Sequence, residues 1–572
     1  RGLMAAVLVA VNLPILVATA RALARGWQPL GDNGLLLVRS RDVGTSHHPF
    51  LGTWTSASLV LDEHVNNPGP LYFDAIAPAI KLLGPWVGVA VGVMLVNMAA
   101  SSLAVVMARR ISGAESMVAV AVVTVGLQFA MGSELLFDVW QPNALVLPFF
   151  AFLVMVTALA GGDLAMVPWV VGVGSFLVQT HVSHAPLVAI LSLAATGAAV
   201  WSLRRRGATP SWRRPLVWTC VVAVMAWSQP LIEEFTGRGR GNLSRIVASG
   251  GGGDAPTIGA SRALRLVSET TVMGPWFTRG TFENAVSAIG TSADPLQGLL
   301  APRPAAVVVG LAVAMLAAVG VWAHRTGRPG LAAMGAVASV TVVAAAGALA
   351  VSPVNMVGLA AHQMRWLWPV GALASAVALT ALMSAVPSGA DARRRVLIVG
   401  AGAALVVAVA SLPTYRSRSF GPVDSAANLP VAQELVEGLE ALEGRGTVLF
   451  DYTGIRYGEP YSGLVFAELQ DRDIPFVLDD EGLIRQFGEG RRDDGTAVLR
   501  MWQVEGAAAM EVPEGAERVA YGGGRSPGER AEIAELDDQV RSGAIDGDDL
   551  QRWTALDERR RLHAVALLVE PA

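Results

Sequence analysis

Long apolar runs separated by short polar stretches make up the chain as far as residue 413. Each run holds about 16 to 24 residues, enough for an α-helix to cross a hydrocarbon core of roughly 30 Å. The runs lie near residues 3–20, 85–108, 116–131, 143–160, 165–180, 184–203, 216–232, 304–323, 331–351, 366–386 and 395–412. The pattern predicts an α-helical polytopic membrane protein with about 11 transmembrane helices. Three of the runs, 116–131, 165–180 and 216–232, are short, and tilted, re-entrant or fused helices are the alternatives for them.

Arginine is concentrated in alternate loops, and the positive-inside rule places basic loops in the cytoplasm. With the N-terminus inside, the inner loops lie at 109–110, 161–163, 204–214, 324–328 and 393–395, and all but 161–163 are basic. The outer loops are then 21–84, 132–142, 233–303 and 352–365. We therefore expect a multi-pass plasma-membrane protein. The alternative, cleavage of the first run as a signal peptide after Ala20, would leave the other loops on the same sides.

The apolar runs shorten and charge rises from residue 414 onward. Strand-like runs lie at 447–452, 474–478, 497–504 and 563–569, and helical stretches lie at 430–443 and 461–472. This pattern predicts a soluble α/β domain over residues 414–572, following a membrane domain over residues 1–413. An odd number of spans places the soluble domain outside the cytoplasm. We interpret it as a structural or substrate-docking cap, with a second catalytic centre as the alternative.

Composition narrows the function classes. The chain has 572 residues, of which 53% are hydrophobic and 16% are charged, as is typical of a membrane protein. A formal net charge of −4 offers no basic surface for nucleic acid. Cys220 is the single cysteine, so neither a disulfide framework nor a cysteine metal site is expected. Arginine almost replaces lysine, and this bias, with abundant Ala, Val and Gly, indicates a high-GC bacterial genome.

The first outer loop places many polar side chains beside apolar helices. Asp32 stands before an apolar helix start, where its ordinary role is N-capping. Its functional alternative is a general base that takes the proton from an acceptor hydroxyl as it attacks. Asp62, Glu63 and His64 form either a second acid/base or metal group or a solvated turn. Adjacent residues point in different directions, so at most two of these three converge.

Histidines and an asparagine of the same loop are candidate substrate-binding residues. His47 and His48 are neighbours, and neighbouring histidines rarely chelate one ion, so a divalent metal is the lesser alternative and no cofactor is assigned. Asn66 lies in the segment HVNNPGP, whose Pro and Gly residues predict a rigid turn before a second helix.

Further polar side chains fall at the outer ends of later spans. His181 and His184 are three residues apart and share one face if the segment is helical; an interfacial cap is the alternative. His362 and Arg365 lie at another outer boundary, where Trp366 is first explained by an aromatic belt and Arg365 is placed to meet a lipid phosphate. Ionisable groups at membrane depth cost about 2.5–3.5 kcal/mol each. We therefore expect these side chains to line a wet, substrate-binding cavity.

The loop at 237–260 is rich in glycine and arginine. Its glycines follow no strand, so they are not a dinucleotide-binding fingerprint. A flexible linker is the ordinary interpretation. The functional alternative is a mobile lid in which Arg238, Arg240 or Arg245 meets a substrate phosphate.

The order of these features resembles the GT-C superfamily of integral membrane glycosyltransferases. The shared features are an acid just after the first span, a long first loop with an Asn-Pro-Gly-Pro segment, a multi-span body and a soluble outer C-terminal domain. Protein mannosyltransferases, aminoarabinose transferase-like enzymes and actinobacterial arabinofuranosyltransferases show this pattern. The resemblance implies transfer from a polyprenyl-phosphate donor on the outer membrane face, with an acid of the first outer loop as base. Asp32 matches that position, and Asn33 stands where many relatives have a second acid.

The resemblance favours a GT-C type transferase of an actinobacterial cell envelope. It would move a sugar, such as arabinofuranose or mannose, from a polyprenyl phosphate to an envelope glycan, lipid or protein. Membrane lipids are further expected partners. A transporter or flippase for lipid-linked sugars is the alternative, although no internal repeat is visible and ionisable groups concentrate in outer loops. The acids and histidines of the first loop disfavour a non-catalytic scaffold.

Overall fold

The computed structural model describes two compact units. Unit 1 comprises Arg1–Arg25, Phe50–Ala79 and Ala90–Ser417, and unit 2 comprises Gly26–Pro49, Ile80–Val89 and Arg418–Ala572. The structure describes all residues except 60–62, 206, 208–210, 238, 250–255, 272–295, 297–298, 355–360, 386–388, 413–424, 457, 524–526 and 543. The domain boundary expected at residues 413–414 lies outside the described residues and stays a prediction.

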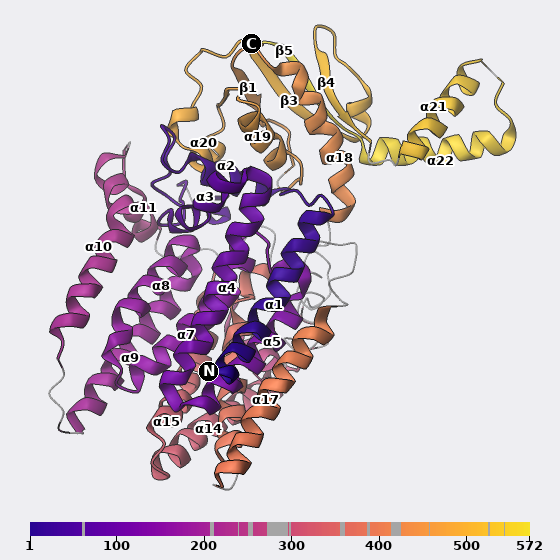
Figure 1. Cartoon of the computed structure of the whole chain (residues 1–572). Coiled ribbons are helices and arrows are strands. Elements are labelled where there is room, and N and C mark those ends of the chain that lie inside the picture. The colour runs from indigo at the N-terminus through magenta and orange to yellow at the C-terminus, as the bar shows by residue number, and fades with distance from the viewer. Residues whose placement is uncertain are drawn as a thin grey trace. The chain divides into compact units, whose positions relative to one another are not determined.

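Long apolar helices dominate unit 1, where they lie side by side (Figure 1). The longest are α1 (Gly2–Ala24), α4 (Pro85–Ser112), α5 (Ala114–Leu135), α7 (Val146–Ala160), α9 (Ala185–Arg205), α10 (Arg213–Thr236), α14 (Pro302–Arg325), α15 (Pro329–Val351), α16 (Leu367–Ala385) and α17 (Ala390–Ser411). With short extensions at α7 and α9, the described residues contain 10 helices long and apolar enough to cross a membrane. The expected polytopic helical architecture is confirmed.

One of the eleven expected transmembrane segments, 165–180, is too short to cross the hydrocarbon core as a straight helix. Residues 165–180 form a 3-10 turn, η2 (Leu164–Met166), followed by α8 (Val167–Thr180). At 1.5 Å per residue, the stretch Leu164–Thr180 is about 25 Å long, less than the hydrocarbon core. The helix ends because His181 adopts an extended backbone, with φ −152° and ψ 112°.

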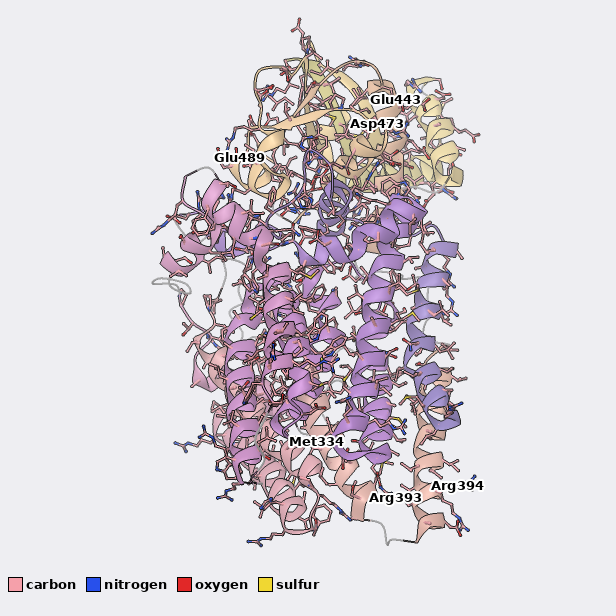
Figure 2. The ribbon with its side chains drawn as sticks, turned by 60° about the vertical axis from the view of Figure 1, so that its left-hand side comes forward. Met334, Arg393, Arg394, Glu443, Asp473 and Glu489 are labelled. Atoms are coloured by element: carbon pink, nitrogen blue, oxygen red, sulfur yellow. The ribbon has the colours of Figure 1, made fainter. Side chains whose placement is uncertain are left out.

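The arginine-rich loops of unit 1 meet at one end of its helices. Arg110 of α4 pairs with Asp163 before η2 at 2.6 Å, and Arg393 of α17 pairs with the buried Glu115 of α5. Figure 2 shows Arg393 and Arg394 at this end. At the start of α15, a Cβ on Gly330 would lie 1.7 Å from the Ile111 carbonyl oxygen, so only glycine permits this close approach. Which side of the membrane this end faces stays a prediction.

Short elements occupy the opposite end of unit 1. They are η1 (Ser56–Leu59), α3 (Leu71–Leu83, which continues into unit 2), α6 (Gln141–Ala144), η3 (Val182–His184), α11 (Asn242–Ala248), α12 (Ala260–Thr271) and η4 (Ala361–Met364). Helix α5 enters this region through a kink at Gly132, whose φ of 76° favours glycine. The chain then leaves helical geometry and carries Asp138 and Asn143 into the polar end.

Unit 2 contains a five-stranded mixed sheet in the order β2-β1-β3-β5-β4. Its strands are β1 (Val448–Asp451), β2 (Phe476–Leu478), β3 (Leu499–Glu505), β4 (Glu517–Gly522) and β5 (Val565–Pro571). Its helices are α2 (Asp32–Asp42), α18 (Ser425–Gly438), α19 (Ser462–Asp471), α20 (Glu481–Phe487), α21 (Pro527–Ser542) and α22 (Gly547–His563). Its short 3-10 turns are η6 (Leu439–Leu442), η7 (Glu489–Arg491) and η8 (Gly506–Met510). Strand β1 is parallel to β2 and β3, whereas β5 is antiparallel to β3 and β4. The expected α/β domain is confirmed, and β4 is a strand that the pattern did not predict.

A buried ion group joins α2 to the rest of unit 2. Asp42 accepts two hydrogen bonds from Arg491, at 2.7 and 2.8 Å, and one from Arg39 at 2.9 Å. Arg39 also donates to the Phe487 carbonyl at 2.7 Å. Burial lowers the pKa of the Arg39 guanidinium to about 10, although Asp42 acts in the opposite direction. Two cations share one buried carboxylate, so removing that carboxylate leaves both without compensation.

We predict that Asp42→Asn destabilises unit 2 by about 3–5 kcal/mol, the usual cost of breaking a buried ion pair from one side. Asp471→Asn is the matched control, because the Arg41–Asp471 pair at 2.9 Å is partly exposed and should change stability by at most about 1 kcal/mol. Hydrogen exchange of α2 and α19 in the full-length protein measures both. Equal protection in the two variants would contradict the role given to Asp42.

Candidate functional site

The polar end of unit 1 gathers four of the residues expected to bind substrate. His181 ends α8, and His184 lies in η3 before α9. Their ring centroids are 6.1 Å apart. His184 is buried, with its ring edge-on to Phe149 at 5.2 Å. Its Nε2 has no hydrogen-bond partner within the described part of the chain.

Arg365 and His362 reach the same region from the segment before α16. The buried Arg365 donates from Nη1 to Asn143 Oδ1, and the Asn143 amide donates to Asp138 Oδ2. The His362 ring lies 4.4 Å from the ring of Trp140, between centroids. Arg365 and His181 both act electrostatically on His362, so these side chains form one constellation, here called the histidine–arginine group.

Two histidines of this group, His181 and His362, are held neutral. Burial lowers the pKa of His181 to about 4. Burial, reinforced by Arg365 and His181, lowers the pKa of His362 to about 3. A neutral imidazole both donates and accepts hydrogen bonds. The group therefore combines a fixed guanidinium with neutral polar rings, an arrangement suited to an anionic ligand that also carries hydroxyl groups.

Asn67 connects the HVNNPGP segment of the first loop to the η3 turn, which carries His184. The Asn67 side chain accepts from the Val182 N–H at 2.9 Å and donates to Thr53 Oγ1 at 2.9 Å. The following turn passes so close to Gln179 that a Cβ on Gly69 would lie 2.2 Å from its Oε1. Asn67 thus fixes the loop beside His181 and His184.

The preceding residue, Asn66, fastens the loop to α11. Asn242 is fully buried, accepts from the Asn66 N–H at 2.9 Å and donates to the Asn66 carbonyl at 3.0 Å. Glu233 accepts from the Asn242 N–H at 3.0 Å, and Glu234 accepts from the Leu243 N–H at 2.8 Å. These carboxylates satisfy backbone donors at the start of α11, so one part of the expected lid, Asn242–Ala248, is helical.

Two arginines around α11 contact the first loop. Arg240 pairs with Glu63 at 3.4 Å, with both side chains largely exposed. Arg245 donates to the His64 carbonyl at 3.4 Å and to the Arg240 carbonyl at 2.8 Å. The His64 Nδ1 accepts from the Trp54 indole at 3.0 Å. Of the remaining residues expected here, Asp62 and Arg238 lie outside the described residues.

The other expected residues belong to unit 2. Gly31, with φ 53°, is the N-cap of α2, and Asp32 is its first helical residue. Asp32 is exposed and acts electrostatically on Tyr452, whose phenol has its pKa raised by burial and by Glu459 and Asp32. Asp32 is therefore not the N-cap, which corrects the capping interpretation.

His47 and His48 have separate surroundings. His48 Nδ1 accepts from the Gly44 N–H at 2.9 Å. His47 lies near Arg491 and Asp42, and burial followed by the Arg491 charge lowers its pKa. Across the described residues, no three His, Cys, Asp or Glu side chains form a metal-binding group.

Comparison with known proteins gives little guidance. No family model and no curated protein matches the chain. Among solved structures, the crystal structure of ArnT from Cupriavidus metallidurans bound to undecaprenyl phosphate matches 89% of this chain and 93% of its own, with 13% sequence identity and a TM-score of 0.45. A likeness at that level adds nothing to the chemistry of the site, which rests on the residues of this chain.

Several contacts of the site have no counterpart in the sequence analysis. Asn143, Asn67 and Asn242 were not predicted, although each lies in or beside a polar stretch between apolar runs. Their partners are 222, 115 and 176 residues away. Only the polar character of such stretches was available as a signal.

We predict that unit 1 loses stability as the pH falls from about 7 towards 4. The unfolded chain protonates His181 near its ordinary pKa of 6.5, whereas the folded chain resists until about 4, so the unfolded state binds more protons in this window. His181→Gln should make the unfolding temperature less dependent on pH. His324→Gln is the control, because His324 is exposed near the end of α14. An unchanged pH dependence in His181→Gln would contradict the neutral state of His181.

Proposed function

We propose that the chain is a membrane glycosyltransferase that takes a sugar from a polyprenyl-phosphate donor. The donor combines a long apolar chain, a phosphate and a sugar rich in hydroxyl groups. Unit 1 offers matching chemistry, because apolar helices lead to an end where Arg365 lies among neutral imidazoles. The resemblance of the sequence pattern to the GT-C superfamily supports the same proposal.

The observation that carries the proposal is the fixed position of Arg365. Its guanidinium is buried and held by the Asn143 amide, so little side-chain freedom is lost when a ligand binds. A guanidinium stabilises the charge that develops on a departing phosphate. The Nε2 of His184, which has no hydrogen-bond partner among the described residues, is available to a sugar hydroxyl. Arg240 and Arg245 are then further contacts of the donor phosphate.

Asp32 is the proposed general base. Because Gly31 serves as the N-cap of α2, capping does not account for a carboxylate at position 32. In the proposed step, the acceptor oxygen bonds to the anomeric carbon while the bond from that carbon to the phosphate oxygen breaks. The hydroxyl proton passes to Asp32, and the electron pair leaves with the polyprenyl phosphate. One displacement of this kind inverts the anomeric centre.

The remaining parts of the proposal keep the predicted topology, in which the short helix α8 is counted as a crossing beside the ten longer helices. The reaction takes place on the extracytoplasmic face, where unit 2 also lies, and the acceptor is an envelope glycan, lipid or protein. Arabinofuranose and mannose are the first sugars to test, because they belong to the groups that the sequence pattern resembles. Asp62, Glu63, His64, His47, His48 and Asn66 stay candidate site residues.

We predict that Asp32→Asn lowers turnover of a polyprenyl-phosphate sugar by about 10²–10⁴-fold, the usual contribution of a positioned base. Stability should change little, because Asp32 is exposed and Asn is tolerated in a first helical turn. Asp391→Asn is the matched control, since Asp391 is an exposed acid in the first turn of α17. Product formation by purified protein, tested with arabinofuranose and mannose donors, measures the effect.

Two results would contradict this assignment. Full turnover by Asp32→Asn would remove Asp32 as base, and Asp62, Glu63 or His64 would be tested next. Movement of the lipid-linked sugar across a vesicle membrane without any glycosidic product would replace the transferase by a flippase.

We further predict that replacing Arg240 and Arg245 together by Gln raises the KM for the donor roughly tenfold, because each is a partly exposed cation worth about 0.5–1 kcal/mol. The maximal rate should change less, since neither contacts the proposed reacting carbon. Arg262→Gln on α12 is the control, because Arg262 is exposed. An unchanged KM would return this segment to the role of a structural linker.

A further inference from the structure

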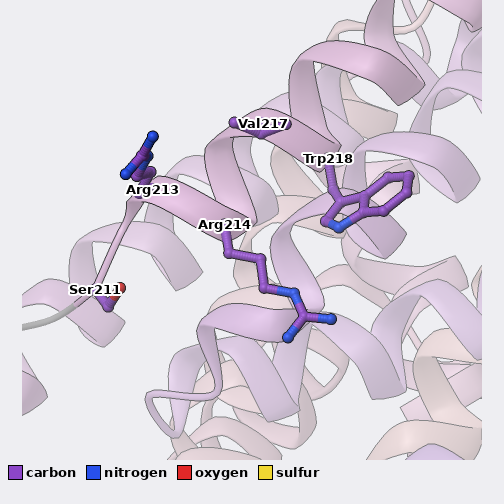
Figure 3. Close-up of a pocket in the computed structure, with 5 residues that line it drawn as sticks. All are labelled: Ser211, Arg213, Arg214, Val217 and Trp218. Atoms are coloured by element: carbon purple, nitrogen blue, oxygen red, sulfur yellow. The ribbon is translucent and has the colours of Figure 1, made fainter.

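A shallow pocket lies at the arginine-rich end of unit 1, at the start of α10. It is lined by Ser211, Arg213, Arg214, Val217 and Trp218 (Figure 3). The Arg214 guanidinium and the Trp218 ring lie on the same side of the helix (Figure 3). The histidine–arginine group lies at the other end of the bundle, so the pocket has no part in the proposed transfer reaction.

The cations at this pocket have no acidic partner among the described residues. Arg213 and Arg214 are exposed and make no ion pair there. At the end of α9, the exposed Arg205 stacks over Trp201 at 4.2 Å and likewise has no acid beside it. By contrast, Arg110 and Arg393 at the same end of the unit are paired with acids. The charge at the start of α10 is therefore uncompensated.

An apolar surface continues from the pocket along α10. Val217, Val221, Val224 and Met225 are exposed by 57%, 41%, 69% and 70%. A helix that exposes such residues along its length faces lipid in a membrane protein. The pocket thus places two arginines and an indole ring next to an apolar strip on α10 that can contact acyl chains. A molecule with an anionic headgroup and acyl chains matches both features.

We propose that this pocket binds the headgroup of an anionic phospholipid. The phosphodiester contacts the Arg214 guanidinium, with Arg213 at the rim of the pocket and the Trp218 ring at the level of the glycerol. The acyl chains lie along the exposed face of α10. Basic pockets at the ends of transmembrane helices are recurrent sites for such headgroups, and indole rings favour the membrane interface.

A general attraction between arginine and the membrane surface does not explain this arrangement. Arg394 and Arg395 at the start of α17 are also exposed and also lack an acidic partner within the described residues, and Figure 2 shows Arg394 at this end of the unit. No tryptophan lies in the sequence of α17. This pair therefore provides a control of equal charge without the indole.

Native mass spectrometry of the full-length protein, released from mixed phosphatidylglycerol and phosphatidylcholine micelles, tests the proposal. The wild-type protein should retain phosphatidylglycerol in preference to phosphatidylcholine. Arg213→Ala with Arg214→Ala should weaken that retention about thirtyfold, whereas Arg394→Ala with Arg395→Ala should stay within about twofold of wild type. Arg213→Lys with Arg214→Lys should keep most of it, because an ammonium also binds phosphate.

Three outcomes would overturn the proposal. Retention by the Arg213/Arg214 double alanine variant would remove the site, and equal loss in the Arg394/Arg395 variant would reduce it to unspecific surface charge. Competition by soluble glycerol phosphate equal to that of phosphatidylglycerol would show a pocket for free anions. None of these measurements depends on glycosyl transfer, so this proposal and the proposed function fail separately.

Discussion

Asparagine side chains join the segments that form the polar end of unit 1. Asn67 bridges the first loop and the η3 turn, Asn242 pairs with both backbone groups of Asn66, and Asn143 links Arg365 to Asp138. An amide donates and accepts at once and carries no charge. It can therefore satisfy buried backbone groups without the large desolvation cost of an ion. These contacts help to hold the loops that carry the histidines and arginines at the helix ends.

In unit 2, a buried ion group connects segments that are distant in the sequence. Asp42 is shared by Arg39 and Arg491, all three being buried. Such a group is costly to desolvate and is strongly destabilised when one member is lost. It demands a particular geometry, which fixes α2 against η7. In unit 1, one contact that orients the buried Arg365 is its hydrogen bond to the amide oxygen of Asn143.

The sequence predicted the elements better than their contacts. Apolar length located ten spans correctly but overestimated 165–180, because hydropathy alone does not reveal that the helix ends at His181. Strand β4 was not predicted, because it begins with the charged residues Glu517 and Arg518 and lies at an edge of the sheet. The place of α2 in unit 2 could not be predicted, because Asp42 and Arg491 are 449 residues apart.

The same limit applies to the site. The spacing of His181 and His184 predicted a shared face only for a helical segment, but His181 has an extended backbone between α8 and η3. Their rings lie 6.1 Å apart because the two residues are neighbours in sequence. Their association with His362 and Arg365 depends on contacts between distant segments, and a single sequence shows none of these. The two ends of unit 1 then differ in how they present polar groups. One end buries a cation among amides and neutral rings, which suits selective recognition of one ligand, whereas the other exposes cations beside indole rings, which suits contact with lipid headgroups. Because each end is built from different residues, changes at one end should leave the chemistry of the other intact.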